Sequence, residues 1–143
     1  MDIVVREIEE KDYPSVLSIG NRELGCTNSI EEVRDHYARI RDNECYKNFV
    51  AVLDGEVVGF ISAVWAYGMG QEVGFLHIVA LAVKAERQNR GIGTKLIEQI
   101  EDYAKEKGIG SIILNSRIQR TDAHAFYKSR GYDNRAWSFS KKL

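Results

Sequence analysis

The sequence predicts a mixed α/β fold in which strands and helices alternate along the chain. Short runs rich in β-branched residues alternate with stretches whose apolar residues recur every three to four positions. The almost continuously apolar run at 73–83 is typical of a strand that is covered on both faces. The later part of the chain has the order strand, helix, strand, which implies a locally parallel pair.

The first half of the chain is expected to contain a strand, two helices and a β-hairpin. Residues 2–8 form a short β-branched run, and Asp12 is placed to cap the helix that follows. The sequence Ser-Ile-Glu-Glu, from Ser29, is a capping box at the start of a second helix. Asp54 and Gly55 join two β-rich runs, because this pair accepts the positive φ angles of a type I′ turn.

The second half is expected to contain the long buried strand and then helix, strand, helix and strand. Residues 93–108 carry an apolar stripe at helical spacing and end in lysines and a glycine. Residues 111–115 follow as a short buried strand. Thr121 is placed to cap a last helix, which Gly131 ends. The alternation at 136–143 is typical of a final strand.

Length and composition are those of one soluble domain. The 143 residues are 44% hydrophobic and contain no repeat or linker, so we expect a single domain over residues 1–143. The formal net charge of -1 gives no broad basic surface for nucleic acid or an acidic membrane. Cys26 and Cys45 lack the spacing of a zinc site or a disulfide framework, so no metal is expected. Without a signal-peptide pattern or a long apolar run, we expect a cytoplasmic protein.

The stretch Glu86–Leu96, "ERQNRGIGTKL", carries two glycines between the long strand and a helix. A loop that enters a helix from the end of a buried strand directs backbone N–H groups and the positive end of the helix dipole at one point, which attracts anions. Gly91 and Gly93 permit close approach, and Arg90 and Thr94 add a charged donor and a hydroxyl. This chemistry suits a pyrophosphate.

Two familiar phosphate motifs are excluded by position. The P-loop ends in Gly-Lys-Ser/Thr, whereas here Gly93 is followed by Thr94 and only then by Lys95. The dinucleotide-binding fingerprint has a third glycine or alanine where this chain has Leu96. It also has an acidic residue after the next strand, where this chain has Asn115.

The chain resembles the GNAT superfamily of acyl-CoA-dependent N-acyltransferases over nearly its whole length. The pyrophosphate signature of that family is Gln or Arg, two residues, Gly, one residue, and Gly or Ala. It is matched by Gln88, Asn89, Arg90, Gly91, Ile92 and Gly93. The segments "LAVKAERQ" and "AHAFYKSRGY" also resemble family segments, in the same order and at similar distances. The resemblance implies a single-domain GNAT-like mixed sheet of about six to seven strands, flanked by about four helices, with a splayed central parallel strand pair.

The resemblance also implies acetyl-CoA as the cosubstrate, without a metal, and assigns residues to it. Residues 88–94 would hold the pyrophosphate. The backbone of Leu81, Ala82 and Val83 would pair with the pantetheine arm, and Asn115 would line the facing side of the cleft. A backbone N–H at a bulge in the central strand, expected within residues 81–83, would bind the oxyanion.

Acyl transfer to an amine requires a base, because an amine of pKa near ~10.4 is mostly protonated at pH 7. His77 is the first candidate, since it aligns with the glutamate that serves as base in histone-acetylating members. Its place in the strand suggests the same side-chain parity as Val79, Leu81 and Val83. The alternative for His77 is a buried, hydrogen-bonded structural residue. Glu72 is a second candidate, acting through a water.

The leaving thiolate of coenzyme A requires a proton donor. Tyr127 matches the tyrosine that family members use for this purpose, in the pattern Ala123, Tyr127, Gly131 and Tyr132. The alternative is a core aromatic residue whose hydroxyl is satisfied. One position departs from the family, because many members have an asparagine where this chain has Arg120. We expect Arg120 to be a solvated surface residue, and the alternative is a contact to the phosphates of the coenzyme or to an acidic substrate.

The acceptor side is less specific in sequence. Trp65, Tyr67 and residues 68–72 lie where the family usually admits substrate, as do residues 21–29. We therefore expect an N-acetyltransferase that moves an acetyl group from acetyl-CoA to a primary amine of a small molecule, by direct attack through a tetrahedral intermediate.

Two alternatives remain open. One is a protein or peptide N-acetyltransferase acting on an N-terminus or a lysine, and the other is a catalytically silent CoA-binding regulatory module. A small-molecule amine is the expected partner, with no nucleic acid and no membrane. Homodimers are common in the family, although no motif here fixes one.

Overall fold

A computed structural model of the chain describes residues 2–70 and 73–143. The chain divides into two compact units, Met1–Ile113 and Leu114–Leu143, and each unit is described by itself. The α/β class expected from the sequence is confirmed, with five strands in the described residues instead of six to seven.

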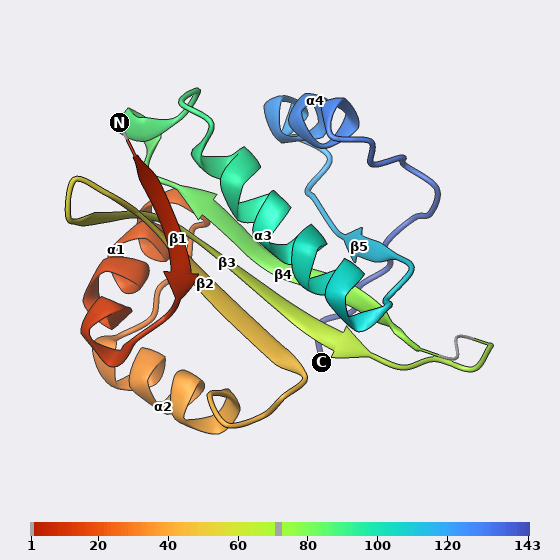
Figure 1. The fold of residues 1–143 in the computed structure, drawn as a ribbon, viewed down its shortest axis with the longest axis horizontal. Helices are drawn as coiled ribbons and strands as arrows, with labels where there is room; N and C mark the ends of the chain where they lie inside the picture. The colour runs from red at the N-terminus through yellow and green to blue at the C-terminus, as the bar shows by residue number, and fades with distance from the viewer. Residues whose placement is uncertain (1, 71–72) are drawn as a thin grey trace. The chain divides into compact units, whose positions relative to one another are not determined.

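The sheet has the strand order β1-β2-β3-β4-β5 (Figure 1). The strands are β1 (Ile3–Glu7), β2 (Tyr46–Leu53), β3 (Glu56–Ala66), β4 (Phe75–Val83) and β5 (Ile112–Leu114). The first four strands are antiparallel neighbours. The expected parallel pairing of β4 with β5, and the splaying of that pair, stay predictions.

The β2–β3 hairpin confirms the turn expected at Asp54 and Gly55. Both residues have positive φ, 52° and 78°. Leu53 pairs with Glu56, so the two turn residues directly connect the strands.

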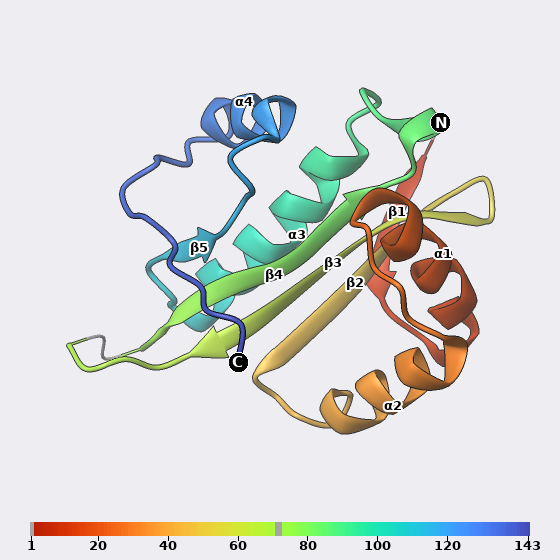
Figure 2. The same cartoon turned by 180° about the vertical axis from the view of Figure 1, so that it is seen from behind.

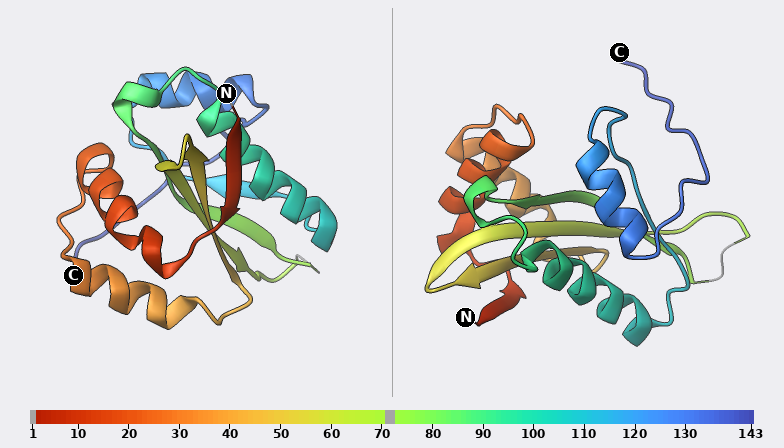
Figure 3. Two further views of the ribbon diagram at one scale, coloured as in Figure 1. Left: turned by 60° about the vertical axis from the view of Figure 1, so that its left-hand side comes forward. Right: turned by 90° about the horizontal axis from the view of Figure 1, so that it is seen from above.

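Helices cover both faces of the sheet in the first unit. Helices α1 (Tyr13–Glu23) and α2 (Ile30–Ile40) lie on one face, and α3 (Ile92–Lys107) lies on the other (Figure 3, left). Helix α3 is in front of the sheet in Figure 1 and behind it in Figure 2. Two short 3-10 turns complete the unit, η1 (Glu10–Asp12) and η2 (Ala85–Arg87). This layering explains why β4 is apolar along almost its whole length.

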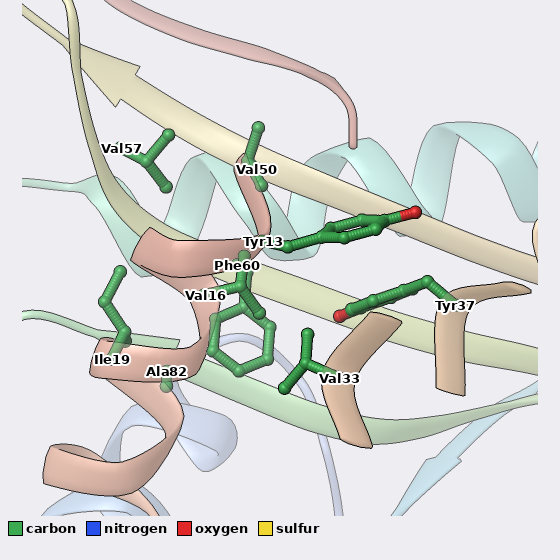
Figure 4. Packing of buried hydrophobic residues seen from close by; sticks show 9 residues of the cluster. All are labelled: Tyr13, Val16, Ile19, Val33, Tyr37, Val50, Val57, Phe60 and Ala82. Carbon is green, nitrogen blue, oxygen red and sulfur yellow. The ribbon is translucent and has the colours of Figure 1, made fainter. Parts of the chain in front are cut away.

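The core below α1 and α2 is built around two tyrosines (Figure 4). The rings of Tyr13 and Tyr37 stack with centroids 4.8 Å apart and planes 16° apart. Around them pack the buried residues Val16, Ile19, Val33, Val50, Val57, Phe60 and Ala82. On the other face, Leu96, Ile97 and Ile100 of α3 are fully buried.

The helix starts in the first unit follow two different patterns. The capping box of α2 is confirmed, because Glu32 N donates to Ser29 Oγ and Ser29 N donates to Glu32 Oε1. Asp12, by contrast, does not cap α1 with its side chain as expected. Its carboxylate instead accepts hydrogen bonds from the Arg6 guanidinium and from the Glu9 amide, so it is already engaged within the preceding turn.

The second unit contains the end of β5 and helix α4 (Thr121–Ser129). Gly131, with φ of 90°, ends this helix as expected. The amides of Gly131 and Tyr132 donate to the carbonyls of Lys128 and Tyr127, which is the Schellman arrangement of a helix C-terminus.

Two expectations for the second unit are wrong. Thr121 is the first residue of α4 and not its cap, which is Arg120, and no side-chain hydrogen bond caps the helix. Residues 136–143 form no strand, and Trp137 and Phe139 are 84% and 87% exposed. The alternating pattern shows which side chains share a face, but a strand also needs a neighbour for its backbone hydrogen bonds. Helix α4 offers no such edge.

Candidate functional site

The glycine loop, residues 88–94, follows β4 and runs into the first turn of α3, as the sequence predicts. Gln88 Nε2 donates to Val83 O over 3.2 Å, which closes the backbone at the end of β4. Asn89 and Gly91 have positive φ of 63° and 81°, so the chain passes two left-handed positions before α3 begins at Ile92. Glycine and asparagine are the residues that adopt this conformation most readily.

The first turn of α3 presents free backbone donors. The first intrahelical hydrogen bond runs from Lys95 N to Gly91 O, over 3.0 Å. The amides of Ile92, Gly93 and Thr94 therefore have no acceptor within the helix. No side chain caps this helix start. Because these amides and the positive end of the helix dipole point the same way, the loop suits an anion.

Positive side chains add to this local field. Arg90 and Lys95 are exposed, and within the described part of the chain neither is held in an ion pair. Both side chains are thus available to an anionic group at the start of α3. This charge is local, in a chain whose net charge is only -1.

Strand β4 contains a bulge at Val79. Ser62 on β3 pairs with Ala80, whereas the next residue, Ala63, pairs with Ile78. Val79 is therefore an extra residue without a partner on β3. Its side chain is 54% exposed, in a strand that is otherwise mostly covered.

The bulge lies upstream of residues 81–83, the segment in which the oxyanion donor was expected. Leu81, Ala82 and Val83 continue the regular pairing with β3. The expected position of the bulge is therefore wrong. An apolar run identifies the strand, but the pairing with β3 decides which residue is left over, and β3 is distant in sequence. The backbone N–H of Val79 is therefore a candidate oxyanion donor that the sequence did not indicate.

The bulge also changes the face on which His77 lies. Cross-strand partners share a face of the sheet, and His77 pairs with Val64 while Ala80 pairs with Ser62. Ser62 and Val64 are two residues apart, so His77 and Ala80 lie on the same face. Ala80 packs against the core below α1 and α2. The expectation that His77 shares its face with Leu81 is wrong, because the extra residue reverses the alternation.

A buried polar contact supports β3 opposite the bulge. Burial raises the pKa of Tyr37 to about 12, and the Ser62 hydroxyl lowers that pKa by a smaller amount. Asn48 pairs with Ser62 across β2 and β3. Its Oδ1 atom is buried and has no hydrogen-bond partner in the described residues. The face of the sheet that carries His77 therefore also carries polar side chains.

Tyr127 belongs to the second unit, on α4. Its ring contacts Phe126 and Tyr132, with centroids 5.5 and 6.2 Å away. Burial raises the pKa of Tyr127 above its ordinary value, and the positive charge of Arg120 lowers it by a smaller amount. The phenol is therefore protonated at neutral pH and is able to donate a hydrogen bond. Arg120 is exposed, in agreement with the solvated surface position considered for it. Its positive charge nevertheless acts on Tyr127.

A sequence model of the acetyltransferase (GNAT) family matches residues 5–132. The chain belongs to the acetyltransferase (GNAT) family. Its α/β fold and its glycine loop are thus those of a family of acyltransferase enzymes.

The relatives of this GNAT chain include N-acetyltransferases that are named for small-molecule substrates. It is 32% identical over 94 residues to the aminoalkylphosphonate N-acetyltransferase of Salmonella typhimurium, covering 66% of this chain and 61% of that protein. It is 27% identical over 139 residues to the L-amino acid N-acetyltransferase AaaT of Escherichia coli, covering 92% and 83%. The match covers about half to three fifths of the length of several relatives, 53%, 61% and 49% in three of them.

Solved structures show the same fold. A transcriptional regulator from Bacillus halodurans C-125 superposes with a TM-score of 0.91 at 19% identity, and the superposition covers 99% of this chain and 100% of that one. An aminoglycoside acetyltransferase from a soil metagenomic sample has a TM-score of 0.85 at 22% identity, covering 99% and 96%. At these identities the likeness is one of fold.

Asn115, Glu72 and Trp65 are the other residues of this GNAT chain that the sequence singled out. Asn115 is exposed and directly follows β5 in the second unit. Glu72, the second candidate base, lies outside the described residues. Trp65 Nε1 donates to Val73 O over 2.6 Å, and its ring stacks on Tyr67 with centroids 5.6 Å apart. Trp65 therefore ties the ends of the β3–β4 connection together.

Among residues 2–70 and 73–143, no three or more His, Cys, Asp or Glu side chains gather as metal ligands would. None of the described helices has the length and apolar character needed to span a membrane.

Proposed function

We propose that this GNAT chain transfers an acetyl group from acetyl-CoA to a primary amine of a small molecule. The glycine loop is the observation that carries the proposal. Its two left-handed residues, Asn89 and Gly91, lead into the uncapped start of α3, where three amides and the exposed Arg90 and Lys95 are available. This set of donors is complementary to the pyrophosphate of coenzyme A.

Residues next to the loop would hold the rest of the cosubstrate. The backbone of Leu81, Ala82 and Val83, at the end of β4, is the proposed partner of the pantetheine arm. Asn115 is proposed to contact the same arm. Gln88 would act indirectly, because its side chain already holds Val83 O and so fixes the start of the loop.

The chemical step requires three groups. The neutral amine attacks the thioester carbonyl, and the backbone N–H of the bulged Val79 is proposed to stabilise the oxyanion. His77 is the proposed base that takes the proton of the amine. When the tetrahedral intermediate collapses, the C–S bond breaks and Tyr127 gives its proton to the departing thiolate.

The relatives support a small acceptor. Two of them are named for aminoalkylphosphonate and for L-amino acid. Both compound classes carry an amine and an acidic group in one small molecule. We therefore propose a small amine of this kind as the first class of acceptor to test.

Release of free thiol from acetyl-CoA tests this function directly. The panel contains aminoalkylphosphonates, amino acids, polyamines, aminoglycosides and peptides with free N-termini or lysines. We expect turnover with at least one small amine. Turnover with peptides alone would contradict the small-molecule acceptor, and silence across the panel would favour a binding module without catalysis.

The Tyr127→Phe variant tests the proposed acid. Removing the phenol proton should lower kcat by about 10- to 100-fold, at or below the usual range for a general acid, while the Kd for acetyl-CoA stays within about twofold. Tyr132→Phe is the matched control, since it removes a hydroxyl from the neighbouring ring and should leave kcat unchanged. Unchanged turnover in Tyr127→Phe would reject its role as the acid.

A further inference from the structure

The four residues between β4 and the glycine loop each have a partner from another part of the first unit. Lys84 and Arg87 both form ion pairs with Glu56, at the start of β3. Glu86 pairs with Arg22 of α1, with 3.2 Å between Arg22 Nη2 and Glu86 Oε2. The backbone amide of Ala85 donates to the carboxylate of Glu23, the last residue of α1, over 2.8 Å.

The glycine loop itself is much less engaged. Within the described residues, Gln88 reaches back to Val83 O, and the amides of Ile92, Gly93 and Thr94 have no acceptor in the helix. The backbone is therefore fixed just before the loop and open where the pyrophosphate is proposed to bind. An anchor at this place sets the direction in which the free amides point.

Among the four contacts, the one from Glu23 acts on the backbone itself. The other three are ion pairs between side chains, and each has an acidic partner that is about half exposed, at 45% for Glu56 and 52% for Glu86. Water and salt reach these carboxylates and screen the pairs. A carboxylate that accepts from an amide is a charge-assisted hydrogen bond, which is stronger and more directional. Glu23 is half-buried, so its side chain is partly shielded from water.

We propose that Glu23 is a positioning residue for the cosubstrate, which holds the amide of Ala85 and thereby orients the glycine loop. This proposal rests on the proposed function, because the loop must bind a CoA thioester for its orientation to matter. The anchor also links the loop to the end of α1. Residues 24–26 continue from there, with the amides of Leu24 and Cys26 both bound to Gly20 O.

Positioning and simple electrostatics predict opposite results at Glu23. A carboxylate near a phosphate site repels the ligand, so if charge alone mattered, every neutral substitution would tighten binding. If position matters, the result depends on whether an acceptor oxygen remains. Glu23→Gln keeps an oxygen of the same reach, Glu23→Asp shortens the side chain by one methylene, and Glu23→Ala removes the acceptor.

Calorimetric titration with acetyl-CoA and steady-state kinetics separate these cases. For Glu23→Ala we expect the Kd and the KM for acetyl-CoA to rise about 5- to 10-fold with kcat nearly unchanged, which is the size of effect that the loss of one ordinary hydrogen bond has. Glu23→Gln should stay within about twofold of the wild type, and Glu23→Asp should lie between the two. Glu44→Ala, which removes an exposed carboxylate elsewhere, is the control for charge.

Amide hydrogen exchange at Ala85 gives a readout that does not depend on turnover. It should be faster in Glu23→Ala than in the wild type, without a change in the exchange of core strands. If the wild-type protein binds acetyl-CoA and Glu23→Ala binds it with the same Kd, the positioning role of Glu23 is overturned, while the proposed function still stands. Tighter binding in both Glu23→Ala and Glu23→Gln would replace it with charge repulsion. If the wild-type protein does not bind acetyl-CoA, the proposed function and this inference both fail.

Discussion

Asp12 illustrates how a buried charge is stabilised in this chain. It is 3% exposed, and its carboxylate receives two hydrogen bonds from Arg6, of 2.7 and 2.9 Å, and one from Glu9 N. Burial by itself raises the pKa of Asp12, but the bonds from Arg6 and Glu9 outweigh it and leave that pKa below the ordinary value. The ionised form is therefore the one that the fold favours.

The lowered pKa predicts how stability depends on pH. The contribution of Asp12 is fully present above its unfolded pKa of about 3.9 and is lost as the pH falls through its lower folded pKa. Asp12→Asn should lower the free energy of unfolding at pH 7 by about 1–3 kcal/mol and should flatten its decrease below pH 4. Urea unfolding at several pH values measures both effects. Asp42→Asn, at a 95% exposed side chain, is the control, and an equal pH dependence in both variants would contradict the assignment.

His77 and Val79 are residues whose positions in the sheet could not be predicted from the sequence. Strict alternation along β4 places His77 on the face of Leu81, and one extra residue in the strand reverses this. Nothing in the apolar run marks Val79 as the unpaired residue, because its partners on β3 determine the register. At the glycine loop, by contrast, the residue types themselves indicate the backbone conformation, since the left-handed positions are occupied by asparagine and glycine.

Three local signals predicted their elements correctly, although the helix caps expected at Asp12 and Thr121 were wrong. The capping box at Ser29, the turn at Asp54 and Gly55, and the glycine stop at Gly131 each depend on residues within about five positions, and all three are confirmed. The strand expected at 136–143 depends on a distant pairing partner, which its own alternation does not specify.

The packing of α3 on the sheet depends on Gly59 in β3. A Cβ atom at this position would lie 2.9 Å from Ala82 O and 3.2 Å from the Leu96 Cδ1 atom. Both neighbours are held in place, since Ala82 O is backbone and Leu96 is fully buried. The missing side chain therefore lets α3 lie close to β3 and β4.

Gly59→Ala should consequently destabilise the first unit. We expect a loss of about 1–3 kcal/mol in the free energy of unfolding, the usual cost of overpacking a core. Gly110→Ala is the matched control, because a Cβ atom there would meet nothing within 4 Å and its φ is not in the left-handed region. Urea unfolding of both variants provides the measurement, and equal midpoints would show that α3 does not depend on Gly59.

In the first unit as a whole, the glycine loop follows the end of a covered strand. Helices on both faces bury β4, and its end leads through η2 into the uncapped start of α3. The family and the α/β class were both predictable from the sequence, because the Gln88–Gly93 signature and the order of elements are local or sequential features. A single domain over residues 1–143 and a homodimer stay predictions.

Binding of acetyl-CoA to the wild-type protein is the most direct test of this account. A ligand that binds the folded state at 100 times its Kd stabilises it by about 2.7 kcal/mol, which raises the Tm by several degrees. We predict this rise with acetyl-CoA and with free CoA, and none with adenosine, which lacks the pyrophosphate. An unchanged Tm at millimolar acetyl-CoA, confirmed by the absence of heat in calorimetric titration, would contradict the assignment of the glycine loop.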